Sequence, residues 1–164
     1  MIASLRRGPT AFIVGAVLIT ATVAASPTAR GDNARFNKSV VSDVFTIQHQ
    51  AGCTNDVRVS PALSLAAERH TDDVLANRSL DGDIGSDGSN PQDRANATGF
   101  RGAVAETVAI RPALAISGLD LLKQWYYDPV AYAIMSNCAN TAIGVWSENS
   151  LDRTVVVAVY GRPS

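Results

Sequence analysis

The sequence predicts an α+β fold, and three observations support this class. Helical and strand-like patterns follow one another in the order helix, helix, short helix, strand, helix, strand, strand. The chain has 164 residues, of which 46% are hydrophobic, and this is enough apolar material for one sizeable core. No internal repeat is visible, so we expect the strands to pair into a single small sheet that the helices cover.

The N-terminal segment, residues 1–25, is expected to be a secretory signal peptide. Arg6 and Arg7 precede an uninterrupted apolar run from Ala11 to Ala25, which ends in small residues. This run is shorter than the ~20 apolar residues that a membrane-spanning helix needs, and this favours a cleaved signal over a retained anchor.

The folded domain is expected to occupy residues 39–164. Residues 26–38 are polar, contain helix breakers and show no periodic apolar face, so they predict a flexible leader. Beyond them, apolar residues recur at helical spacing from Val40 to Ile47, and this helix is expected to stop at Gly52.

A second helix is predicted to begin after Ser60, with Pro61 at its first position, and to run to about Asn77. His70 lies on its apolar stripe. A histidine in such a place is either a core residue hydrogen-bonded to the backbone or a ligand that needs a partner, and the first is the commoner case. The stripe consists of Leu63, Ala67, His70 and Val74.

The stretch 79–107 carries most of the functional signal. It opens with an acidic loop of turn-forming residues, followed by a short helix that starts at Asn90 and ends at Gly99. A strand is then predicted over Gly102–Ile110, in which Glu106 is the only charged side chain. A carboxylate held against a core is costly unless it is paired or hydrogen-bonded, so Glu106 is a candidate site residue.

The C-terminal part is predicted to contain one helix, a short helical turn and a hairpin. Ser117 begins the helix, and Asp128 with Pro129 closes it. Asp128 can also cap the turn that follows, and this structural role is the simpler explanation of its presence. The short turn spans Val130–Met135, and the strands of the hairpin span Thr141–Ser147 and Arg153–Tyr160.

Charge and cysteine content exclude some classes of function. The net charge is −1, the pI is about 6.1 and no cluster of Lys or Arg is present, so no surface for nucleic acid is expected. Cys53 and Cys138 are too few for a structural zinc site. In an exported chain they are expected to form a disulfide with each other, the alternative being two separately buried thiols.

Six short motifs occur in order between about Val40 and Gly161. They are SPALSLAAERHTDD, GSDGS, DRANATGF, AET, the W-x-x-D-P that begins at Trp125, and AIGV. With them the chain resembles the CAP superfamily, which groups cysteine-rich secretory proteins, venom antigens and pathogenesis-related proteins, and it is most similar to the short bacterial members. The resemblance implies a three-layer α-β-α sandwich.

The resemblance also implies a cleft, which in many members holds two histidines and two acids that can bind a divalent metal. The four cleft positions fall on Asp83, Glu106, Asp128 and Ala131, and Thr107 stands where the family has the asparagine of G-E-N. Both histidines are therefore absent. We expect no zinc site and no cofactor, because the remaining oxygen ligands favour Ca²⁺ or Mg²⁺.

Two functions follow from these features. The preferred one is a secreted, non-catalytic CAP module that binds a small apolar ligand, such as a lipid, or an extracellular protein partner. The alternative is a hydrolase that uses the acidic cleft, with Glu106 as general base and Asp83 or Asp128 assisting a divalent cation. In the first case Asp83 is a turn residue, Asp128 a cap, and Glu106 is bonded to backbone amides.

Overall fold

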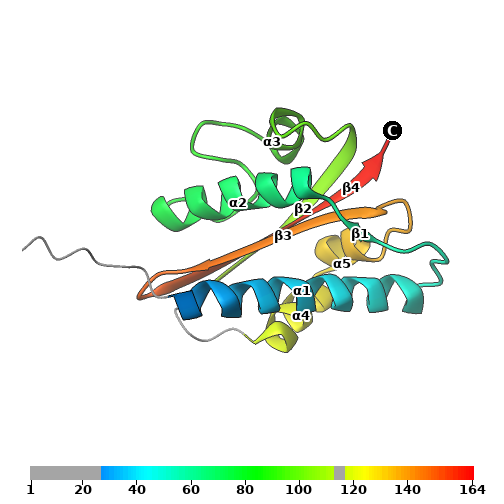
Figure 1. Ribbon diagram of the computed structural model, residues 1–164, viewed down its shortest axis with the longest axis horizontal. Coiled ribbons are helices and arrows are strands. Elements are labelled where there is room, and N and C mark those ends of the chain that lie inside the picture. The colour runs from blue at the N-terminus through cyan, green and yellow to red at the C-terminus, as the bar shows by residue number, and fades with distance from the viewer. Residues whose placement is uncertain (1–26, 113–116) are drawn as a thin grey trace, which may run out of the picture.

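The computed structural model describes residues 27–112 and 117–164, with side chains from residue 33 onward. Within this part of the chain lie five helices and a sheet of four strands (Figure 1). The predicted α+β class is confirmed. The elements are α1 (Pro27–Gln50), β1 (Arg58–Val59), α2 (Pro61–Ala76), α3 (Pro91–Ala97), β2 (Gly102–Pro112), α4 (Gly118–Tyr127), α5 (Pro129–Met135), β3 (Ala142–Asn149) and β4 (Arg153–Pro163).

The sheet has the order β1-β3-β4-β2, so that β2 forms one edge. Strands β3 and β4 are antiparallel, which confirms the predicted hairpin, and β2 pairs antiparallel with β4. The two-residue strand β1, which the sequence patterns did not predict, runs parallel to β3. The central strand β4 is fully buried from Val155 to Tyr160, and the core is therefore built around it.

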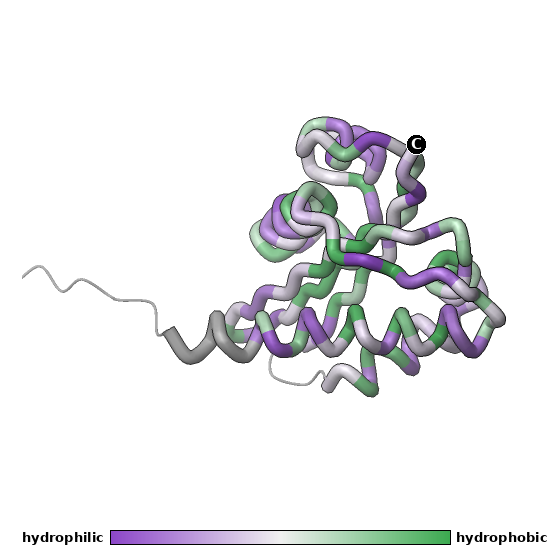
Figure 2. The backbone as a smooth tube through the Cα atoms, turned by 45° about the vertical axis from the view of Figure 1, so that its right-hand side comes forward, coloured by the Kyte–Doolittle hydropathy of each residue, from purple (hydrophilic) through white to green (hydrophobic). Residues whose placement is uncertain are grey.

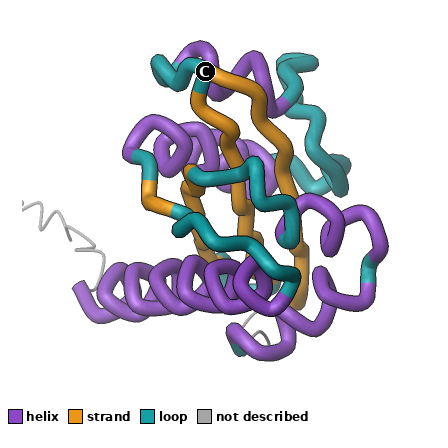
Figure 3. Tube along the Cα trace, turned by 90° about the vertical axis from the view of Figure 1, so that its right-hand side faces the viewer, coloured by secondary structure: helices purple, strands orange, loops and turns teal. Residues whose placement is uncertain are grey.

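Helices cover both faces of the sheet and make the three layers that the CAP resemblance implied (Figures 1 and 3). Helices α1, α4 and α5 pack on one face, around Trp125, Met135 and Tyr160. Helices α2 and α3 pack on the other, around Leu63 and Val159. Along α1, hydrophilic and hydrophobic positions alternate in short runs, as a helix with one buried face requires (Figure 2).

Helix α2 lies unusually close to the sheet at Gly144 of β3. A Cβ at this position would collide with the backbone of Leu63 and Ser64 in the first turn of α2. Glycine is therefore required here by the contact between helix and strand rather than by backbone conformation. This contact fixes the side of the sheet from which α2 presents His70.

The predicted starts of α2, α3 and α4 are confirmed by their caps. The side chains of Ser60, Asn90 and Ser117 accept hydrogen bonds from the third residue of the respective helix. At α3 the arrangement is a full capping box, because the Asp93 carboxylate also accepts from the backbone N–H of Asn90.

The prediction of a flexible leader is wrong from Pro27 onward, because α1 begins there. Polar residues that suggested a leader instead bond to the sheet: Asn33 donates to the Ser147 carbonyl at 3.1 Å, and the Asn37 side chain accepts from the Ser147 hydroxyl at 2.7 Å. Phe36 packs against the core. The first turns of α1 contact β3 through amide side chains and so show no apolar periodicity. This explains why the sequence patterns did not predict a helix there.

The predicted signal peptide, residues 1–25, lies outside the described residues. In residues 27–112 and 117–164, no helix combines the length and the apolar character needed to cross a bilayer.

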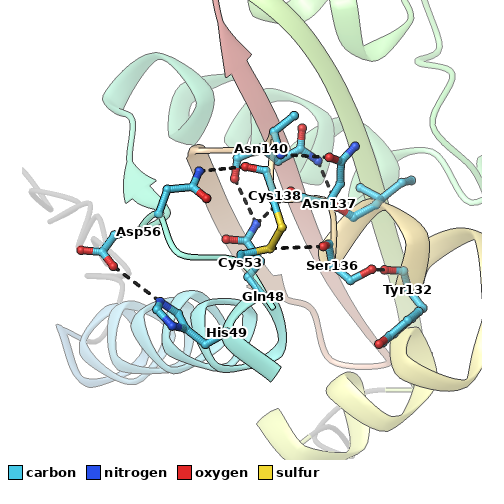
Figure 4. The surroundings of a disulfide bond; sticks show 12 residues. Gln48, His49, Cys53, Asp56, Tyr132, Ser136, Asn137, Cys138 and Asn140 are labelled. Atoms are coloured by element: carbon cyan, nitrogen blue, oxygen red, sulfur yellow. Dashed lines mark hydrogen bonds and ion pairs between the residues drawn. A yellow bond between two sulfur atoms is a disulfide. The ribbon is translucent and has the colours of Figure 1, made fainter. Parts of the chain in front are cut away.

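The predicted disulfide between Cys53 and Cys138 is confirmed (Figure 4). It joins the chain just after α1 to the loop between α5 and β3, across 85 residues of sequence. The same junction holds Gln48 of α1, whose buried side chain donates to the Asn140 carbonyl at 3.0 Å. The loop that follows α5 is thus fixed to α1 both covalently and by a buried hydrogen bond.

Candidate functional site

Glu106 lies in the middle of β2, opposite Val159 of β4, and its side chain points toward α2 and α3. The side chain is completely buried. One carboxylate oxygen, Oε1, accepts from Nη2 of Arg94 at 3.0 Å and lies 3.4 Å from Nε2 of His70. Glu106 was expected to bond to backbone amides. The structure pairs it with two side chains instead.

Arg94 comes from the middle of α3 and is itself only 7% exposed. Besides Glu106, its guanidinium donates to the carbonyl oxygens of Asp83, at 2.7 Å, and Ser89, at 2.8 Å. Both carbonyls belong to the acidic loop that precedes α3. One buried cation thus joins this loop to the sheet, and its charge balances the buried carboxylate.

His70 reaches the same cluster from α2. Its Nε2 lies 3.0 Å from the Gly82 carbonyl, which can only accept, so Nε2 carries the proton in the neutral ring. The other nitrogen, Nδ1, is buried and has no partner among the described residues. Charging the ring would place a proton on Nδ1 without an acceptor, and burial accordingly lowers the pKa of His70.

The electrostatics of Glu106 reflect two opposing influences. Burial raises the pKa of Glu106 to about 7, while the neighbouring Arg94 guanidinium lowers it in part. The second carboxylate oxygen, Oε2, is buried without a partner in the described part of the chain. Near neutral pH the Glu106 carboxyl therefore holds a proton for a larger fraction of the time than an exposed glutamate does.

The three other predicted cleft positions lie away from this cluster. Asp83 is exposed in the loop, where its backbone carbonyl accepts from Arg94 and its charge contributes to the raised pKa of Glu106. Asp128 is the N-cap of α5, where its Oδ1 accepts from the backbone N–H groups of Val130, at 2.8 Å, and Ala131, at 3.0 Å. The simpler explanation of Asp128, a cap, is confirmed.

A small pocket of about 160 Å³ brings three of the four predicted positions together. Glu106, Asp128 and Ala131 all line it, together with Gln124 and Trp125 of α4, whereas Asp83 does not. The Glu106 side chain faces away from it into the α2–α3 layer, so what Glu106 offers the pocket is its backbone.

The metal that the CAP resemblance implies does not fit these residues. No group of three His, Cys, Asp or Glu side chains in the described ranges could hold an ion. The Glu106 Oε1 atom is taken by Arg94 and His70, Asp128 is occupied at the α5 cap, and Ala131 has no donor atom. The side chains at the predicted cleft positions therefore supply no convergent ligand set for such an ion.

A larger groove adjoins the small pocket and shares Val130 and Ile134 with it. It has a volume of about 540 Å³ and lies between β2 and α5. Its walls carry mainly small and aliphatic side chains, with Arg162 of β4 at one end. The lining residues include Ala103, Ala105, Val130, Ala133, Ile134 and Arg162.

No protein-family model and no curated protein matches this chain. Solved structures do match. An outer surface protein of Borrelia burgdorferi aligns with a TM-score of 0.69 at 16% identity, over 79% of this chain and 94% of that protein. An extracellular SCP-domain protein of Bacillus anthracis aligns with a TM-score of 0.70 at 14% identity, over 86% and 45%.

A cysteine-rich secretory protein of Staphylococcus aureus aligns with a TM-score of 0.60 at 9% identity, over 79% of this chain and 39% of that protein. This chain therefore spans nearly all of the Borrelia protein but less than half of the other two. The chain has the fold of the CAP, or SCP-domain, proteins, and the resemblance drawn from its motifs is confirmed at the level of the fold.

The sequence analysis missed Arg94 as a partner of Glu106 and left the role of His70 open. A signal for Arg94 was present: it is the only cation between Ser79 and Phe100, and a buried carboxylate on the next strand needs one. His70 lies buried on the apolar face of its helix, as the stripe predicted. It meets Glu106 from that face, because the glutamate side chain is turned toward α2.

Proposed function

We propose that this protein is an exported, non-catalytic binding module of the CAP fold, and that its ligand site is the groove between β2 and α5. The observation that carries the proposal is the position of the Glu106 side chain, which is fully buried and paired with Arg94 and His70 behind the strand. A carboxylate in this position joins the sheet to α2 and α3 and is out of reach of a substrate in the groove.

The groove supports the binding part of the proposal. It offers about 540 Å³ of space with aliphatic walls from β2 and α5, and Val130 at its rim is 71% exposed. Concave sites lined by apolar side chains with a few polar groups are the usual form of ligand sites. Export is supported by the outer surface or extracellular nature of the structural neighbours and by the signal-like N-terminus.

The hydrolase alternative has one observation in its favour, the pKa of Glu106 raised to about 7, which would suit a general base. A base must also lie within hydrogen-bond reach of the proton that it removes. The Oε1 atom of Glu106 already has two partners, and the Asp128 carboxylate accepts at the α5 cap. The binding function is therefore better supported.

Native mass spectrometry of the protein recovered from its producing cells tests the proposal. We expect a bound ligand mass on the wild-type protein that is lost in Ala133→Arg, because an arginine at this exposed position of α5 fills the groove. Ala76→Arg is the matched control, at an exposed alanine of α2 that lines neither cavity. A ligand that stays on Ala133→Arg, or hydrolysis of a model ester abolished by Glu106→Gln, would contradict it.

A further inference from the structure

The free edge of β2 presents unused backbone hydrogen-bonding groups beside the small pocket that Glu106 and Val108 line. In an antiparallel pair, alternate residues turn both their N–H and C=O groups away from the partner strand. The outward residues are identified by their side-chain partners: the Val104 N–H donates to Gln92 Oε1 at 3.1 Å, and the Gly102 carbonyl accepts from Gln92 Nε2 at 3.0 Å. Glu106 has the same parity, so its N–H and C=O also point outward.

Two side chains close the edge above and below this point. Gln92 of α3 occupies the edge at Gly102 and Val104, and the indole N–H of Trp125 approaches the Val108 carbonyl at 3.4 Å. Between them, the C=O of Val104, both backbone groups of Glu106 and the N–H of Val108 have no partner in the described ranges. The open part of the edge is thus a short, bounded segment.

Exposure agrees with this assignment. Glu106 as a residue keeps 8% of its surface exposed, while its side chain is 0% exposed, so the accessible atoms are backbone atoms. Gln124 adds a further unused group beside them, since its Oε1 atom is buried, has no partner in the described part of the chain, and belongs to a residue that lines the small pocket. A ligand that satisfies these backbone groups and Gln124 Oε1 must supply both hydrogen-bond donors and acceptors.

Charges of opposite sign lie at the groove and at the small pocket that adjoins it. Arg162, opposite Ala103 in the β2–β4 register, is exposed and lines the groove. Asp128 is exposed and lines the small pocket together with Val108. Neither side chain forms an ion pair within the described residues. The distance along the strand from Ala103 to Val108 is ~16 Å, at about 3.3 Å per residue.

We propose that the groove binds an extended peptide segment of a partner protein, which adds as a further strand to the edge of β2 beside Glu106. This rests on the proposed function and names the ligand of the same site. The segment spans about six residues, with an acidic residue near Arg162, a basic residue near Asp128, and small or β-branched side chains between them that fit the aliphatic walls. Strand addition of this kind takes affinity from main-chain hydrogen bonds and specificity from side-chain pockets.

An apolar small molecule explains the observations less well. It would fill the space between Val130 and Ile134 but leave the backbone groups of Glu106 and the Gln124 carbonyl without partners, and buried polar groups that stay unpaired weaken binding. An extended peptide supplies an N–H and a C=O to the same side at every second residue, which is the pattern that the edge presents.

A peptide array provides the test. The probes are acetylated and amidated hexapeptides Glu-x4-Lys and Lys-x4-Glu, with Ala, Val, Ser or Thr at the central positions, and the uncharged analogues Gln-x4-Gln. We expect at least one charged probe to bind the wild-type protein about tenfold more tightly than its uncharged analogue, which corresponds to ~1.4 kcal/mol. Its binding should be lost in Ala133→Arg and retained in Ala76→Arg.

Backbone methylation of the best probe then separates strand addition from side-chain binding. Two isomers are compared, one methylated on alternate amides facing the protein and the other on the remaining amides. We expect one isomer to lose binding at least tenfold and the other to keep it, because only one set of N–H groups faces the edge. Equal binding of both isomers would overturn the proposal.

Three further outcomes also overturn it, and they separate it from the proposed function. If no probe binds the wild-type protein better than Ala133→Arg, the occupant is not a peptide of this kind. If a non-peptide ligand is found by mass spectrometry in the wild-type protein alone, the binding function stands and the peptide does not. If sedimentation shows a dimer that Ala133→Arg abolishes, the edge pairs with a second copy instead.

Discussion

On the α2–α3 side of strand β2, charged and titratable side chains are buried and use one another as partners, whereas on the α5 side backbone groups of the strand edge have no partner among the described residues. Glu106 takes part in both regions, with its side chain in the first and its backbone at the second. The difference shows that a carboxylate at a cleft position of the fold can be paired with side chains of other elements, while the proposed binding surface consists of backbone and methyl groups.

The largest effect is expected from breaking the buried cluster at Arg94. At pH 8, above the raised pKa of Glu106, Arg94→Met removes the cation that pairs with the buried carboxylate and the bonds that hold the Asp83 and Ser89 carbonyls. Removing one partner of a buried ion pair costs ~3–5 kcal/mol, so we expect a loss of about 4 kcal/mol in the free energy of unfolding, measured with urea.

Two further variants sharpen this measurement. In Arg94→Met with Glu106→Gln the uncompensated charge is gone, and part of the lost stability should return. Arg69→Met, at an exposed arginine of α2, should change stability by less than ~0.5 kcal/mol. Equal losses for Arg69→Met and Arg94→Met would show that the buried pair has no special role.

The second effect concerns the groove side, where the disulfide fixes the loop after α5. Replacing Cys53 and Cys138 by alanine removes a cross-link over 85 residues, which in the chain-entropy model stabilises the fold by ~4 kcal/mol before native-state strain reduces it. We expect a loss of about 3 kcal/mol. The rate of backbone amide hydrogen exchange should increase more around Asn137 and Asn140 than around Arg94. An equal increase in both regions would show that the disulfide does not act on the groove side in particular.

The order of elements and their boundaries followed from the sequence where local chemistry decides them. Ser60, Asn90 and Ser117 marked helix starts because their side chains cap the backbone next to them. The start of α1 was missed, because Asn33 and Asn37 are held by β3, which lies more than 100 residues further along the chain. Local patterns do not record such contacts.

The candidate site was predictable only in part, for the same reason. Glu106 was singled out correctly as a buried charge, and Asp128 as a cap. The direction in which the Glu106 side chain points depends on the pairing of β2 with β4, and its partners come from two other elements. The open edge depends on strand order, which the sequence patterns left undetermined.

A third prediction uses the pH dependence of stability to test the buried side. Because burial raises the pKa of Glu106 to about 7 in the folded protein from an ordinary value of 4.5, the folded state binds this proton more tightly than the unfolded chain does. The stabilisation is fully present below pH 4.5 and is lost as the pH rises through 7. Glu106→Gln, which cannot ionise, keeps it.

The measurement is a series of urea titrations of both proteins between pH 4.5 and 8. The stability of Glu106→Gln relative to wild type should rise with pH, by ~1.4 kcal/mol per pH unit at most. His70 acts with the opposite sign, since its lowered pKa removes stability as the pH falls below 6.5, so the change between pH 6.5 and 8 is the part of the difference that reports Glu106. A difference that stays constant with pH would mean that Glu106 titrates normally.

The smallest effect is expected at Asp128, where it separates stability from binding. Asp128→Ala removes the acceptor for the Val130 and Ala131 N–H groups and should cost ~1 kcal/mol, the usual value of an N-cap. Asp128→Asn keeps an equally good capping oxygen, so its stability should stay within a few tenths of a kcal/mol of wild type.

The same variant tests binding, because asparagine lacks the charge of aspartate. The Asp128→Asn protein should bind the lysine-bearing hexapeptide several-fold more weakly than wild type does, while its affinity for Gln-x4-Gln is unchanged. If Asp128→Asn is as unstable as Asp128→Ala, the charge and not the capping geometry supports α5, and the two roles of this residue cannot be separated by substitution.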